Sequence, residues 1–245
     1  MRIGRLAILV ACPLLAWPAH AQPQQPRIVA FGDSITWGAN ATNNSVQHYR
    51  PLLPLFWHRP GAHDTTYPGA LQCMVRRTVL DYGVPGETTA EGLLRLIQLM
   101  STIQPRVVLL MEGTNDMLAA SPLSRTTDSL TLDVRAVQHG GGTAILMTLP
   151  RTYYPPGSSS YATNTRVVEL NTAIRQLAAQ LAVPLVDVEA TFPPGRQGIA
   201  LMRSRSGVND YLHPNDRGNA LIARAVMRGG VLHHHGMLSR RRCSG

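Results

Sequence analysis

The chain has 245 residues, of which 44% are hydrophobic and 15% are charged. These proportions are typical of one folded domain and exclude an intrinsically disordered chain. No uncharged apolar run is long enough to span a bilayer, so stable membrane insertion is not expected. The formal net charge of +9 comes from arginines alone. They are spread along the chain without interleaved aromatic residues, and the sequence therefore does not predict nucleic-acid binding.

Residues 1–21 have the pattern of a secretory signal peptide. Two arginines precede the apolar stretch 6–17, and Ala-His-Ala at 19–21 matches a small-x-small cleavage site. We expect a secreted or periplasmic protein whose mature chain begins near Gln22. A buried N-terminal helix and a lipoprotein anchored at Cys12 are the alternatives.

Two cysteines, Cys73 and Cys243, remain after signal removal. A disulfide between them is compatible with an oxidising compartment. The sequence does not show whether the two residues lie within bonding distance, so we predict two separate thiols. No cysteine–histidine spacing indicates structural zinc, and neither a metal nor a cofactor is expected. The tail, residues 233–245, contains three adjacent histidines and three adjacent arginines and is expected to be flexible and solvated.

Short apolar runs alternate with longer helical patterns, which predicts a parallel sheet covered by helices. The predicted strands are 27–31, 78–82, 106–111, 143–147 and 184–188. The predicted helices are 67–77, 87–100, 123–139, 161–182 and 215–227. Residues 39–66 and 189–209 are expected to be loops, the first of them a long surface insertion. The pattern indicates a single doubly wound three-layer α/β/α sandwich, with five parallel strands, over residues 22–232.

Polar residues follow the ends of the first three predicted strands, where an open parallel sheet binds its ligands. Ser34 follows the first strand, Gly86 the second and Asn115 the third, while Asp210 and His213 precede the last helix. A hydroxyl, an imidazole with a carboxylate, and N–H donors are the groups that acyl transfer requires. The pattern therefore predicts a serine nucleophile in this sheet.

These residues resemble the four blocks of the GDSL, or SGNH, hydrolase family, which is named after Ser, Gly, Asn and His. The blocks here are Phe31-Gly32-Asp33-Ser34-Ile35-Thr36, Gly86, Gly113-Thr114-Asn115-Asp116 and Asp210-x-x-His213. They occur in the family's order, and the resemblance covers about residues 27–228. It implies a flavodoxin-like fold. Residues 104–108 and Tyr67-Pro68 look most like the bacterial lysophospholipase, thioesterase and arylesterase group.

The resemblance also implies a role for each block. Ser34 is expected to be the nucleophile and His213 its general base, with Asp210 orienting the imidazole. The expected oxyanion hole consists of the backbone N–H groups of Ser34 and Gly86 and the side-chain amide of Asn115.

The chain departs from the family pattern at Asp81, where the family often has asparagine. The insertion 39–66 is also longer than in compact members, and its aromatic residues are suited to stacking on a sugar, holding an acyl chain or anchoring the loop. Asn40 and Asn43 lie in N-x-S/T sequons. The block residues Asp33, Thr114 and Asp116 are expected to stabilise turns.

Together these features predict an exported serine esterase that acts through an acyl-enzyme on Ser34. A carbohydrate O-acetyl esterase and a non-catalytic envelope protein that binds acylated glycans are the alternatives. The expected partner is a small ester or an acylated glycan or lipid, and the oligomeric state is left open. The sequence contains no G-x-S-x-G or P-loop motif, which excludes the α/β-hydrolase elbow and the P-loop type of phosphate binding.

Overall fold

The computed structural model describes residues 28–43, 64–202, 207 and 209–232. The predicted signal peptide, most of the insertion 39–66 and the tail 233–245 therefore lie outside the described residues.

Five parallel strands form one sheet in the order β2-β1-β3-β4-β5. The strands are β1 Ile28–Gly32, β2 Val79–Gly83, β3 Val107–Met111, β4 Thr143–Met147 and β5 Leu185–Val186. Ile28 is in register with Val79 on one side and Val107 on the other. The strand order reverses direction between β1 and β3, which is where sheets of this kind bind ligands. The predicted doubly wound α/β fold is confirmed.

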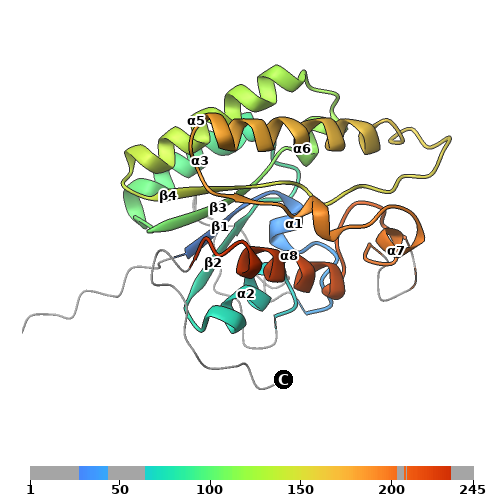
Figure 1. The fold of residues 1–245 in the computed structure, drawn as a ribbon, viewed down its shortest axis with the longest axis horizontal. Helices are drawn as coiled ribbons and strands as arrows, with labels where there is room; N and C mark the ends of the chain where they lie inside the picture. Colours follow the sequence, from blue (N-terminus) through green and yellow to red (C-terminus); the bar gives the residue numbers. More distant parts are fainter. Residues whose placement is uncertain (1–27, 44–63, 203–206, 208, 233–245) are drawn as a thin grey trace, which may run out of the picture.

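Helices cover both faces of the sheet (Figure 1). The longer helices are α2 Tyr67–Val75, α3 Thr89–Thr102, α5 Leu123–His139, α6 Thr163–Gln180 and α8 Asp216–Arg228. α3, α5 and α6 lie on one face, and α2 packs against α8 on the other. Strands β1, β2 and β3 are buried along their whole length, as continuous apolar runs in a parallel sheet predict.

Helix ends are fixed by side chains that accept orphan backbone N–H groups. Thr88 and Glu91 form a capping box at the start of α3. The Asn215 side chain accepts from the N–H groups of Arg217 and Gly218 at the start of α8. Asn215 is therefore the N-cap of α8.

The structure corrects three predictions. Residues 189–209 are not only loop, because they contain the 3-10 helix η2 Glu189–Thr191 and the helix α7 Arg196–Ile199. β5 has two residues instead of the expected five, since this edge strand pairs only with the end of β4. Cys73 is disulfide-bonded instead of a free thiol, and its partner lies outside the described residues. Sequence separation carries no information on such a distance.

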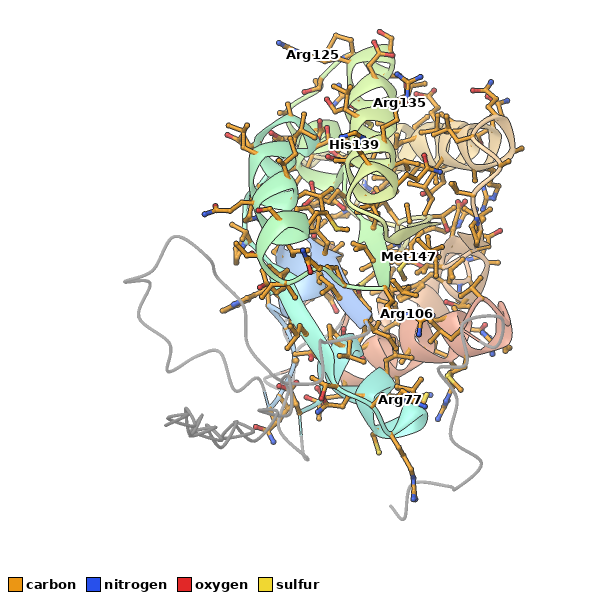
Figure 2. All side chains as sticks on the ribbon, turned by 90° about the vertical axis from the view of Figure 1, so that its left-hand side faces the viewer. Arg77, Arg106, Arg125, Arg135, His139 and Met147 are labelled. Atoms are coloured by element: carbon orange, nitrogen blue, oxygen red, sulfur yellow. The ribbon has the colours of Figure 1, made fainter. Side chains whose placement is uncertain are left out.

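The carboxyl and amino ends of the parallel strands carry different residues. α1 Ser34–Trp37 begins at the carboxyl edge, directly after β1. Figure 2 looks onto the opposite edge, where Arg77 and Arg106 lie just before β2 and β3, and His139 ends α5. Within the described residues, no helix is both long and apolar enough to cross a membrane.

Candidate active site

Ser34 occupies the first position of α1, at the turn that leaves β1. The turn is tight because a Cβ on Gly32 would meet Thr36 Oγ1 at 2.2 Å and the Met111 carbonyl at 2.4 Å. Asp33 caps the helix, accepting a 2.8 Å hydrogen bond from the Ile35 N–H. Ser34 is 8% exposed, so the fold holds it in one place at the carboxyl edge of the sheet.

The imidazole of His213 connects Ser34 to Asp210. Its Nε2 lies 2.9 Å from Ser34 Oγ, and its Nδ1 lies 2.9 and 3.0 Å from the two Asp210 carboxylate oxygens. A carboxylate only accepts, so Nδ1 carries the proton and Nε2 faces the hydroxyl as an acceptor; this tautomer is inferred from the hydrogen-bond network. The arrangement can remove a proton from the Ser34 hydroxyl.

A short turn carries both Asp210 and His213. Asp210 Oδ1 accepts the backbone N–H groups of Leu212 at 3.2 Å and His213 at 2.9 Å. Between them, Tyr211 has a left-handed backbone with a φ of 65°. Burial acts to raise the pKa of Asp210, but the hydrogen bonds and charge of His213 outweigh it and hold that pKa below its usual value. The carboxylate is therefore kept charged beside the imidazole.

Asn40 lies far from this turn in the sequence but contacts it directly, a role that the sequence did not indicate. Its amide donates to the carbonyl of His213 at 2.9 Å and to that of Met202 at 3.1 Å. In the sequence, Asn40 stands out only as part of a sequon. In a single sequence, nothing distinguishes an asparagine that donates to distant carbonyls from any other loop asparagine.

The predicted oxyanion donors Gly86 and Asn115 lie in the segments that follow β2 and β3. Asn115 is on α4 Thr114–Leu118, and its side-chain amide donates to the Glu87 carbonyl at 2.8 Å. One amide hydrogen is used in this way, which leaves the other for a substrate oxygen. Gly86 has a φ of 84° with open space where a Cβ would be, so its backbone conformation favours glycine while its surroundings do not demand it.

A buried ion pair supports this segment. Arg95, on α3, pairs with the Glu87 carboxylate and donates to the Tyr82 carbonyl at 2.7 Å. Its guanidinium also lies 3.9 Å from the centre of the Phe31 ring. Glu87 is thus held at its carboxylate by Arg95 and at its carbonyl by Asn115, which fixes the segment next to Gly86.

Three other acids near the site are buried, and their pKa values are raised. Burial raises the pKa of Asp33 to about 6 and that of Asp133 to about 8. Burial and the nearby Glu87 charge raise the pKa of Glu112 well above its ordinary value. Arg95 is the cation that lowers the pKa of both Glu112 and Asp133. Burial penalises the charged form most, so Glu112 and Asp133 favour the neutral form despite the nearby guanidinium.

Asp116 and Asp81 accept hydrogen bonds that position the segments around the predicted donors. Asp116 accepts from the N–H of Thr89 at 3.0 Å and from its hydroxyl at 2.8 Å, which connects α4 to the start of α3. Asp81, which replaces the asparagine frequent in the family, accepts from the Gly83 N–H at 2.8 Å. It therefore shapes the end of β2, just before the segment that carries Gly86.

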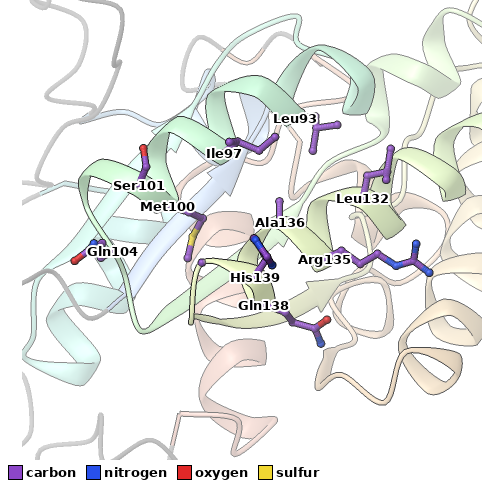
Figure 3. Close-up of a pocket in the computed structure, with 11 residues that line it drawn as sticks. Leu93, Ile97, Met100, Ser101, Gln104, Leu132, Arg135, Ala136, Gln138 and His139 are labelled. Carbon is purple, nitrogen blue, oxygen red and sulfur yellow. The ribbon is translucent and has the colours of Figure 1, made fainter.

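A separate groove lies between α3 and α5, with a volume of about 960 Å³. Figure 3 shows Ile97, Met100 and Leu132 among the residues that line it. It contains none of the predicted site residues and is not part of the candidate site. In the described part of the chain, no group of three or more His, Cys, Asp or Glu residues is arranged to hold a metal ion.

Comparison with known proteins identifies the family of this chain. The GDSL-like Lipase/Acylhydrolase family matches residues 30–221. No curated protein matches the chain.

Among solved structures, an aryl esterase from M. smegmatis is 18% identical with a TM-score of 0.61, over 86% of this chain and 99% of that one. An acetylxylan esterase from Geobacillus stearothermophilus, solved as a catalytic mutant, is 21% identical with a TM-score of 0.61, over 82% and 92%. A carbohydrate acetylesterase from Sinorhizobium meliloti is 16% identical with a TM-score of 0.60, over 82% and 96%. At these identities the similarity establishes the fold alone.

Proposed function

The chain belongs to the GDSL-like Lipase/Acylhydrolase family, and from that premise we propose that it is an exported serine esterase acting through an acyl-enzyme on Ser34. The observation that carries the proposal is the chain of contacts from Asp210 through His213 to Ser34, with Nε2 and Oγ 2.9 Å apart. An alcohol, a base and an orienting carboxylate in this order are what nucleophilic attack by serine requires.

In the first half of the reaction, Ser34 Oγ attacks the ester carbonyl carbon and His213 Nε2 takes the hydroxyl proton. Negative charge develops on the carbonyl oxygen, where the N–H groups of Ser34 and Gly86 and the Asn115 amide would stabilise it. The bond to the alcohol oxygen then breaks, and His213 returns its proton to that oxygen. Alcohol leaves and the acyl group stays on Ser34.

In the second half, water replaces the alcohol. His213 takes a proton from the water as its oxygen attacks the acyl carbon, and the bond to Ser34 Oγ breaks as that oxygen regains a proton. The products are a carboxylic acid and free enzyme. Asp210 stays ionised throughout and stabilises the imidazolium of His213 in both halves.

The test compares wild-type protein with Ser34→Ala in the hydrolysis of p-nitrophenyl acetate. We expect the variant to lose activity by several orders of magnitude, because it has no nucleophile. A fluorophosphonate should label Ser34 alone. Label on another serine would contradict the assignment of Ser34 as the nucleophile. Equal turnover by Ser34→Ala would contradict the proposal and favour a non-catalytic protein that binds acylated glycans.

Export is the part of the proposal supported by sequence alone, through residues 1–21. When the full chain is expressed in a bacterial host, the exported protein should have the mass of a chain that begins near Gln22. A protein that stays in the cytosol with residue 1 intact would remove this part of the proposal and leave the esterase assignment standing.

A further inference from the structure

A pocket of about 520 Å³ lies beside the turn that carries Asp210 and His213. It is formed by the loop after β4, the start of α6, the residues before α7 and the turn itself. Its lining includes Tyr153, Tyr154, Tyr161, Pro194, Asn209 and Tyr211. Figure 1 shows the loop after β4 and α7 at the same end of the sheet as α1.

The wall of this pocket is continuous with the catalytic turn. Tyr211 lies between Asp210 and His213, and its carbonyl accepts the Tyr153 N–H at 2.9 Å. The rings of Tyr154 and Tyr211 are tilted against each other with centroids 6.3 Å apart. A molecule in the pocket therefore contacts the same short segment that positions the imidazole.

The reaction indicates which half of an ester lies on this side. The carbonyl oxygen faces the proposed donors Gly86 and Asn115. The alcohol oxygen must lie near His213, because the imidazole delivers the proton on which the alcohol leaves. Since the pocket shares its wall with the His213 turn, it lies where the alcohol half of the substrate extends.

The lining identifies the class of alcohol. Four of the lining residues are tyrosines and three are prolines, and such rings suit the C–H faces of a sugar. The hydroxyl groups of Tyr154 and Tyr161 have no hydrogen-bonding partner among the described residues. Asn209, whose side-chain amide donates to the Tyr211 hydroxyl at 3.4 Å, also lines the pocket. An acyl chain would cover these polar groups without pairing them, which is unfavourable.

The charges around the pocket favour a neutral ligand. Arg151 lines it, but its guanidinium pairs with Glu189 at 2.9 Å. Glu189 also pairs with Arg175 at 2.7 Å, and Arg175 pairs with Asp187 at 2.8 Å. Two arginines and two carboxylates balance, so no excess positive charge faces the pocket from this cluster. We infer that the pocket binds the neutral sugar ring of an acylated carbohydrate as the leaving alcohol, an inference that rests on the proposed esterase function.

The experiment compares glucose pentaacetate with ethyl acetate, which share the acetyl group and differ in the alcohol. Tyr161 is the residue to change, because it is 48% exposed and its loss should not unfold the protein. We expect Tyr161→Ala to lower the ratio of kcat/KM for the sugar ester to kcat/KM for ethyl acetate about tenfold. Tyr161→Phe, which keeps the ring and loses the hydroxyl, should recover only part of it. Leu94→Ala, exposed on α3, should keep the ratio within about twofold.

An unchanged ratio in Tyr161→Ala, with hydrolysis still dependent on Ser34, would overturn the sugar pocket and leave the esterase standing. The pocket would instead hold the acyl half if the variant lost activity on ethyl octanoate relative to ethyl acetate. A wild-type protein active on ethyl acetate but inactive on the sugar ester would also overturn it. If Ser34→Ala hydrolysed every ester as fast as wild type, the proposed function itself would fail.

Discussion

The two sides of Ser34 are built differently. On the base side, the side chains of Asp210 and His213 are 31% and 20% exposed, and one short turn carries both. On the oxyanion side, Arg95 and the carboxylates around it are buried, with Glu112 only 1% exposed. The first arrangement leaves the imidazole accessible to the water that deacylation needs. The second ties the segment next to the exposed Gly86 to side chains of the core.

This contrast predicts that mutations on the two sides affect activity and stability differently. Damage on the base side should reduce activity and leave the free energy of unfolding nearly unchanged. Damage on the oxyanion side should reduce both, because the donors share their supports with the core.

The largest effect is expected for Asp210→Asn. The isosteric amide no longer fixes the imidazole tautomer or stabilises the imidazolium, a loss of about 10⁴ in kcat in serine hydrolases. The melting temperature should stay close to that of wild type, since the side chain is partly exposed. Steady-state kinetics and thermal unfolding test both parts, with the exposed Asp128→Asn on α5 as control. A variant within tenfold of wild type would end the assignment of Asp210.

Asn115→Ala should lower kcat by about 10²–10³, the effect typical of one lost oxyanion donor. It should also lower stability, because the Glu87 carbonyl loses its 2.8 Å partner. Asn115→Asp has nearly the same shape but no amide donor, so it should lose at least as much activity. Full activity in Asn115→Asp would show that this amide does not contact the transition state.

Asn40→Ala should lower kcat about tenfold, since two hydrogen bonds of about 0.5–1.5 kcal/mol each hold the His213 turn. KM should change little, because Asn40 acts through His213 and not on substrate. Asn43→Ala removes the neighbouring sequon and serves as the control. A change confined to melting temperature, with kcat intact, would make Asn40 a purely structural residue.

The smallest effect concerns stability and pH. Burial raises the pKa of Asp133 from 3.8 to about 8, so the folded state holds a proton that the unfolded state releases. Stability should therefore fall as pH rises between about 4 and about 8. We expect Asp133→Asn to weaken the fall in melting temperature between about pH 5 and about pH 9, whereas Asp128→Asn should not. If melting temperature changed with pH in Asp133→Asn as it does in wild type, the pH dependence would come from other groups.

The fold was predictable where burial left a clear pattern. A continuous apolar run such as 107–111 is typical of a central parallel strand, and the structure has β3 there. The short helices α1, α4 and α7 were not predicted, because four or five residues make about one turn and show no periodicity. At the edge of the sheet, the length of β5 is limited by its pairing with the end of β4, its single neighbour. The residues 184–188 alone do not indicate this limit.

The candidate site divides in the same way. Ser34, Asn115 and His213 stand in motifs that resemblance can find, and the structure brings Ser34 and His213 together. Asn40 and Arg95 act on backbone carbonyls or on a carboxylate elsewhere in the chain. The local sequence pattern at those positions is compatible with any polar residue, so only the structure reveals the roles of Asn40 and Arg95.

The two ends of the segment 44–63 are joined at its base. The Thr65 N–H donates to the Asn43 carbonyl at 2.9 Å, and the Asn43 N–H donates to the Thr65 hydroxyl at 3.0 Å. The described parts of the chain on either side of this segment therefore meet at one point. Relatives can therefore gain, shorten or exchange the intervening stretch at little entropic penalty, which makes it a natural place for new substrate preferences to evolve.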